Sequence, residues 1–131
     1  MERPETRTMP AAGGGAVEAA LLDRLLAEAA TLGEAARDAL LAERTRRADP
    51  LHGLRTQHEL GVIATCLGYA VAWLLEQKAI AAGEIDRASP PPLRAQLDRP
   101  RPDPLAVDPF VADIGEQVRA FGARIERLAA A

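Results

Sequence analysis

Apolar residues recur with the period of an α-helix in three separate segments of the chain. In the first segment, from about residue 16 to residue 46, they are spaced by four, four, seven, four and four positions (Val17, Leu21, Leu25, Leu32, Ala36 and Leu40). This spacing places them on one helix face, and charged residues such as Asp38 and Glu43 lie mostly off that face. The segment is predicted to end before Asp49-Pro50, because the residue before a proline is pushed out of the helical conformation.

The second segment is predicted to be a long helix that is apolar on nearly all sides. Asp49 is its expected N-cap with Pro50 in the first turn, and Gly83 is the expected C-terminal stop. The helix carries three stripes. The first has large residues (Leu60, Ile63, Leu67, Val71, Leu74), the second has small residues (Gly61, Thr65, Gly68, Ala72, Ala79), and the third is mixed (Val62, Cys66, Tyr69, Trp73, Ile80). Two neighbouring helices leave part of such a helix bare, so we expect a second subunit to cover it.

A proline-rich linker, residues 84–107, follows the long helix. It contains six of the ten prolines, and Pro90–Pro92 is expected to be extended. Leu93 and Leu97 are placed to begin a short helical turn between the two proline groups. The linker is too long for a tight hairpin, so it is predicted to be either mobile or functional.

The third helical segment has the most regular pattern in the chain. It opens with Asp108-Pro109, and its apolar residues follow at spacings of three, four, three, four and three (Val111, Ile114, Val118, Phe121, Ile125 and Leu128). Gly115 and Gly122 are seven positions apart on one face and are expected to mark a close helix contact.

These three segments, with no strand pattern between them, predict an all-α protein. The expected architecture is an antiparallel three-helix bundle with a long central helix, paired in a homodimer. Residues 15–131 are expected to form a single domain. Residues 1–14, which lead into Gly13-Gly14-Gly15, are expected to be a disordered N-terminal tail.

Composition narrows the functional classes. The formal net charge of −3 argues against a nucleic-acid-binding protein, which needs a basic face. The single cysteine, Cys66, excludes a disulfide scaffold and fits a cytoplasmic setting. The uncharged run Leu60–Leu75 has sixteen residues, fewer than the roughly 20 of a spanning helix, so a buried core helix is expected rather than a membrane span.

Residue types that carry catalysis do not fall into a catalytic pattern. His52 and His58 are six positions apart, which on a helix separates them by about 120° and does not make a two-ligand metal face. Cys66 lies in an apolar run, where burial raises a thiol pKa and makes a poor nucleophile. Ser89 is the only serine and precedes three prolines. We therefore expect no catalytic residues, no cofactor and no metal. An enzyme is the third alternative, and finding metal bound in a stoichiometric amount would support it.

The stretch from Ala72 to Glu84 resembles the Trp-Leu-Leu-x-Gln-Arg/Lys-Ala…Gly-Glu signature of the RcdA-like family, the regulators of CtrA degradation. The matching residues are Trp73, Leu74, Leu75, Gln77, Lys78, Ala79, Gly83 and Glu84, and Arg124-Ile-Glu-Arg-Leu128 is similar to that family's C-terminal helix. The resemblance implies a small helical, dimeric and non-catalytic adaptor of alphaproteobacteria. Such adaptors help to deliver the cell-cycle regulator CtrA, a response regulator, to the ClpXP protease.

The candidate contact residues come from the long helix. They are Tyr69, Trp73, Gln77, Lys78, Gly61 and Gly68. Trp73 has two interpretations: a core anchor, or a hot spot for a partner protein. An alternative to the adaptor is a helical interaction module for an unknown protein, with no role in proteolysis.

Overall fold

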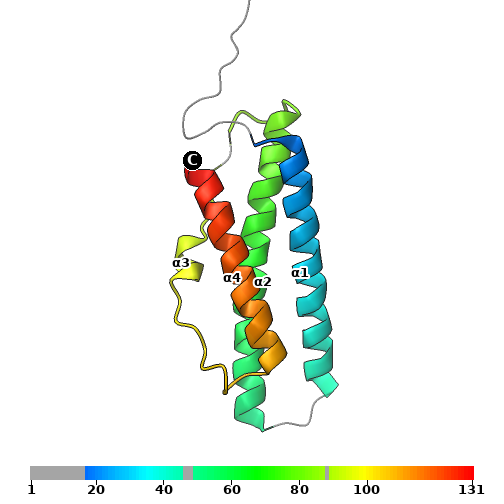
Figure 1. Cartoon of the computed structure of the whole chain (residues 1–131), viewed down its shortest axis with the longest axis vertical. Coiled ribbons are helices and arrows are strands. Elements are labelled where there is room, and N and C mark those ends of the chain that lie inside the picture. Colours follow the sequence, from blue (N-terminus) through cyan, green and yellow to red (C-terminus); the bar gives the residue numbers. More distant parts are fainter. Residues whose placement is uncertain (1–16, 46–48, 88) are drawn as a thin grey trace, which may run out of the picture.

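Among the residues that the structure describes, three of the four helices follow the three apolar patterns. The computed structural model describes residues 17–45, 49–87 and 89–131, and the predicted tail at residues 1–14 lies outside them. The helices are α1 (Ala19–Thr45), α2 (Pro50–Ala81), the short α3 (Arg94–Leu97) and α4 (Pro109–Ala130), as Figure 1 shows. The predicted all-α class and the long central helix are confirmed.

Local capping signals fix where α2 begins and ends and where α4 begins. The Asp49 carboxylate accepts a hydrogen bond from the His52 backbone N–H at 3.0 Å. The Asp108 carboxylate accepts from the backbone N–H of Phe110 at 2.8 Å. After α2, Gly83 has a φ of 76°, a left-handed conformation that glycine adopts at little cost. All three predicted helix boundaries are confirmed.

The helix directions differ from the predicted antiparallel order for one pair. α1 is antiparallel to α2, as the ion pair of Asp23 with Lys78 shows, since these residues lie near the start of α1 and the end of α2. α4, however, runs parallel to α2 (Figure 1). Its N-cap Asp108 donates a backbone hydrogen bond to the Thr56 hydroxyl, near the start of α2, at 3.1 Å. The reason is the long connection, which returns along the bundle before α4 begins.

The core lies where α1, α2 and α4 face one another. Ile63, Leu74, Ile114, Phe121 and Ile125 are almost completely buried there. On α1 the buried positions centre on Leu22, Leu25, Ala29, Leu32 and Ala39, whereas Val17, Leu21, Ala36 and Leu40 are only partly buried. The expectation that Glu43 lies off this face is wrong: its side chain is buried, with a carboxylate oxygen facing Gly53 of α2.

We call residues 89–108 the strap, because this segment runs along α2 and α4 and is anchored by apolar side chains. Leu93 and Val107 are buried. Leu97 of α3 packs over Gly122, where a Cβ atom would lie 3.3 Å from its Cδ2. The predicted helical turn is confirmed as α3, and Gly122 marks a contact with the strap rather than with another long helix.

An ion pair that sequence reasoning missed is buried between α2 and α4. The Arg119 guanidinium donates two hydrogen bonds to the Glu59 carboxylate, at 2.6 and 3.1 Å. The side chains are 4% and 2% exposed. Gly115 makes room for them, because a Cβ atom there would lie 2.2 Å from Oε2 of Glu59. The predicted close helix contact at Gly115 is confirmed, and its partner is α2.

This contact makes Gly115→Ala a sharp test of the packing. A glycine-to-alanine change inside a helix ordinarily stabilises by up to about 1 kcal/mol. Here we expect it to destabilise by about 1–3 kcal/mol or more, because the methyl group displaces the buried carboxylate. The measurement is the urea unfolding free energy at fixed protein concentration. Gly33→Ala in α1 is the control, since a Cβ atom there meets nothing within 4 Å; equal effects of the two changes would contradict this account.

Candidate interaction surface

One side of α2 remains uncovered by the rest of the bundle. We call it the open face; its residues are Gly61, Ala64, Thr65, Gly68, Ala72 and Leu75, of which all but the half-buried Thr65 are exposed. No charged side chain is exposed on α2 between His58 and Glu76. The large and mixed apolar stripes of this helix are buried for the most part, so it is the small stripe that faces outward.

The other long helices do not share this property. An exposed helix face in a globular protein is normally polar or charged. α1 and α4 follow that rule with exposed charged residues along their length, among them Asp23, Arg24, Arg37, Asp38, Asp113, Glu116 and Arg127. The open face is therefore distinctive within the structure, and its composition is not explained by contact with water.

The glycines of the open face have no packing role inside this chain. A Cβ atom at Gly61 or at Gly68 would meet nothing within 4 Å. Each glycine costs about 1 kcal/mol relative to alanine inside a helix. The Thr65 hydroxyl donates to the Gly61 carbonyl at 2.9 Å, so the one polar side chain of this face is already hydrogen-bonded. Small residues with satisfied polar groups are what close approach of a second helix requires.

The six candidate contact residues do not form one patch. Gly61 and Gly68 lie on the open face, and Tyr69 lies beside them, 37% exposed. Trp73 is 5% exposed and belongs to the core, which decides between its two interpretations in this fold. Gln77 is half-buried, and Lys78 pairs with Asp23 at 3.1 Å. Tyr69 and Trp73 belong to the same predicted stripe of α2, but they differ in burial: Tyr69 reaches the surface, whereas Trp73 lies in the core.

The cysteine has the properties of a buried structural residue. Cys66 is 1% exposed. Burial is the main cause that raises the pKa of its thiol; Arg119 lowers that pKa and Glu59 raises it. A thiol that stays protonated near neutral pH is a poor nucleophile, as the sequence predicted. Within residues 17–45, 49–87 and 89–131, no group of three His, Cys, Asp or Glu side chains is placed to hold a metal ion.

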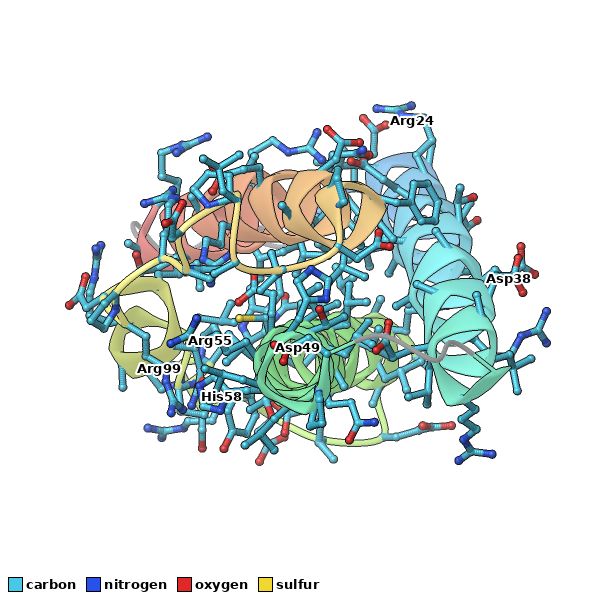
Figure 2. The ribbon with its side chains drawn as sticks, turned by 90° about the horizontal axis from the view of Figure 1, so that it is seen from below. Arg24, Asp38, Asp49, Arg55, His58 and Arg99 are labelled. Carbon is cyan, nitrogen blue, oxygen red and sulfur yellow. The ribbon has the colours of Figure 1, made fainter. Side chains whose placement is uncertain are left out.

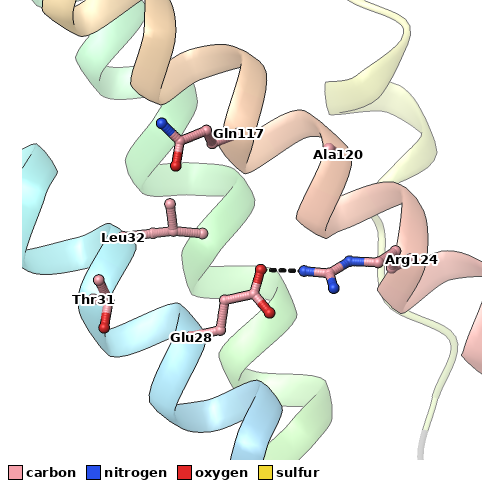
Figure 3. Close-up of a pocket in the computed structure, with 6 residues that line it drawn as sticks. All are labelled: Glu28, Thr31, Leu32, Gln117, Ala120 and Arg124. Atoms are coloured by element: carbon pink, nitrogen blue, oxygen red, sulfur yellow. Dashed lines mark hydrogen bonds and ion pairs between the residues drawn. The ribbon is translucent and has the colours of Figure 1, made fainter.

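A hollow of about 430 Å³ lies between α1 and α4 (Figure 3). Arg124 reaches across it from α4 to an ion pair with Glu28 of α1, as Figure 3 shows. The Gln117 amide donates to Asp113, and the Thr31 hydroxyl donates to the Ala27 carbonyl. The polar groups around this hollow are thus used within the chain and offer little to a ligand.

Two further hollows, of about 370 and 320 Å³, lie on either side of Arg119 beneath the strap. Their rims also carry arginines that already have carboxylate partners. Arg94 pairs with Glu126, and Nε of Arg101 donates to Glu116 at 2.6 Å. These pairs tie the strap to α4, and we assign them a structural role.

The length and composition of α2 would also suit a membrane-spanning helix, alone among the helices of the described chain. Half of its most apolar window is buried inside the bundle. The core helix of a water-soluble bundle has the same features, so this similarity is weak support for a membrane location.

Comparisons with protein-family models, with curated proteins and with solved structures find no match to this chain. What the protein binds is therefore inferred from its own surface.

The buried thiol gives a pH-dependent prediction. The pKa of Cys66 is raised in the folded state above the value of about 8.5 in an unfolded chain. Above that pH the unfolded state binds fewer protons than the folded state, so the free energy of unfolding falls as pH rises. Urea unfolding between pH 7 and pH 10 should show a steeper fall for the wild type than for Cys66→Ala. Parallel curves for the two proteins would show that the thiol does not contribute.

Proposed function

We propose that this protein is a non-catalytic adaptor that works through protein–protein contacts as a homodimer. The observation that carries the proposal is the open face of α2, exposed from Gly61 to Leu75 without a charged side chain. An uncharged helix face of this length is best satisfied by another protein surface. The glycines at its centre favour a second helix over a loop, because they let two backbones come close together.

A second copy of the chain fits the open face when the two α2 helices cross antiparallel. With a two-fold axis between Cys66 and Leu67, Gly61 lies opposite Ala72, and Thr65 lies opposite Gly68. The amide of Gln57 then lies opposite the carboxylate of Glu76, so a polar pair borders each end of the contact. Arg55 falls opposite Lys78 in this register, and Lys78 already has Asp23 of its own chain as a partner. A two-fold arrangement uses the same surface on both subunits.

The adaptor role comes from the resemblance to the regulators of CtrA degradation. The matching stretch occupies the end of α2, where Trp73 and Leu74 are core residues and Gly83 ends the helix. In this proposal the dimer acts in the cytoplasm and helps to bring a response regulator to the ClpXP protease. The alternative, an interaction module without a role in proteolysis, uses the same open face.

Gly68→Arg tests the dimer directly. The position has open space in the single chain, so we expect the variant to fold and to retain its helical circular dichroism. Light scattering at micromolar concentration should give twice 13.9 kDa for the wild type and 13.9 kDa for the variant. Gly68→Ala, which keeps the small size, should remain dimeric. A monomeric wild type, or a dimeric Gly68→Arg, would overturn the proposed interface.

The adaptor role is tested by affinity capture with the tag placed at either end of the chain. We expect ClpX to be recovered with the wild type, alone or with its accessory factors. A substitution of the buried Trp73 is avoided, since it would unfold the core; Gly68→Arg provides the folded comparison. Recovery of no ClpX with either tag would contradict the role in proteolysis, whereas the light-scattering result would still decide the dimer.

A further inference from the structure

The hollow of about 370 Å³ beneath the strap is bounded by the strap on one side and by α4 on the other, and we call it the arginine pocket. The strap lies beside α4 along this part of the bundle (Figure 1). Four of the lining residues come from the strap and four from α4 (Arg94, Leu97, Asp98 and Arg101; Arg119, Ala123, Glu126 and Arg127). The volume falls in the range of roughly 300–1,000 Å³ that is common for ligand sites.

The lining of the arginine pocket carries more positive than negative charge. Four of its residues are arginines and two are acids, Asp98 and Glu126. The carboxylate partners of Arg119 and Arg101 are elsewhere: Glu59 and Glu116 line the neighbouring hollow of about 320 Å³ and not this one. That neighbouring hollow has two arginines and three acids in its lining. The two hollows therefore differ in sign, and the arginine pocket is the one suited to an anion.

Arg119 has a free hydrogen-bonding edge. Both of its bonds to Glu59 come from the two Nη atoms, at 2.6 and 3.1 Å. This pairing leaves the edge that carries Nε, and Nε is buried without a hydrogen-bond partner among the described residues. The whole side chain is only 4% exposed. A buried N–H group without an acceptor is costly, and a guanidinium edge fits two oxygens of one oxyanion.

Other arginines of the pocket also keep donors available. Arg127 is exposed, and its side chain makes no hydrogen bond or ion pair within the part of the chain that the structure describes. Arg101 binds Glu116 through Nε, at 2.6 Å, which leaves both of its Nη atoms for another acceptor. Arg94 already contacts two carboxylates. The ion pairs that tie the strap to α4 can therefore persist while an anion is bound.

We propose that the arginine pocket binds the phosphate group of a small molecule, either free phosphate or a phosphate monoester. Two of its oxygens accept from the Nε edge of Arg119, and the others pair with Arg101 and Arg127. A phosphate dianion suits this set better than a carboxylate, because it has more acceptor oxygens to share among several guanidinium groups. Leu97 and Ala123 offer apolar contact to the group that carries the phosphate. The proposal does not depend on the homodimer, because no residue of α2 lines the pocket.

The probes are inorganic phosphate and glycerol 2-phosphate, each titrated by isothermal titration calorimetry near neutral pH. We expect saturable binding that weakens as salt rises, since partly exposed charge pairs are screened. Arg127→Gln should weaken binding about fivefold, and the variant should fold because this side chain is exposed. Arg119→Lys keeps a positive charge opposite Glu59 but removes the Nε edge, so it should weaken binding at least about tenfold. The tighter probe identifies the source of the phosphate group.

Controls separate a specific site from general effects of anions. Arg24→Gln removes an exposed arginine of α1, far from the strap (Figure 2), and should bind like the wild type. Malonate, a dicarboxylate, should bind at least about fivefold more weakly than phosphate. Circular dichroism checks that each variant folds, and Arg127→Gln keeps the test decisive if Arg119→Lys does not.

Three results would overturn the proposal. They are no saturation with either probe below about 10 mM, equal affinity for malonate and phosphate, and unchanged affinity in a pocket variant that folds. Light scattering of the same samples reports the dimer separately.

Discussion

The buried ion pair of Glu59 with Arg119 is the constraint on which the arrangement of α2 and α4 depends. Removing two charges from water costs several kcal/mol for each ion, and only good geometry with full hydrogen bonding offsets that cost. Both guanidinium–carboxylate bonds are present here, and Gly115 opens the space for them. Nε of Arg119 is buried without a hydrogen-bond partner among the described residues, so part of the cost is not offset. A shift of α4 by one residue would leave a buried charge without its partner. The pair therefore selects one register where apolar packing alone would tolerate several.

The direction of α4 has a consequence for the connecting segment. Because α4 runs parallel to α2, the chain must return along the length of the bundle after α2 ends and before α4 begins. The strap is this returning segment. Leu93, Leu97 and Val107 hold it against the helices, and Gly122 lets it lie close. A hairpin linker would have made an antiparallel bundle without a strap. The strap is thus a product of the order of the helices, and its prolines restrict its backbone.

The local features of this fold could be predicted from the sequence, and the long-range ones could not. Helix positions and ends follow from apolar spacing, from Asp49 and Asp108, and from Gly83, because each signal acts within a few residues. The direction of α4 does not follow, since it depends on how the long strap returns along the bundle. The pairing of Glu59 with Arg119 does not follow either, because these residues are sixty positions apart. Glu43 was misplaced for the same reason: its surroundings are set by α2.

Helix direction also decides how the two ends of the bundle are divided. The start of α1 and the end of α4 lie at one end of the molecule, while the starts of α2 and α4 lie at the other (Figure 1). The 32 residues of α2 separate these ends by about 48 Å. A group attached after α4 is therefore kept about this far from the start of α2, because packed helices of this length form a rigid rod.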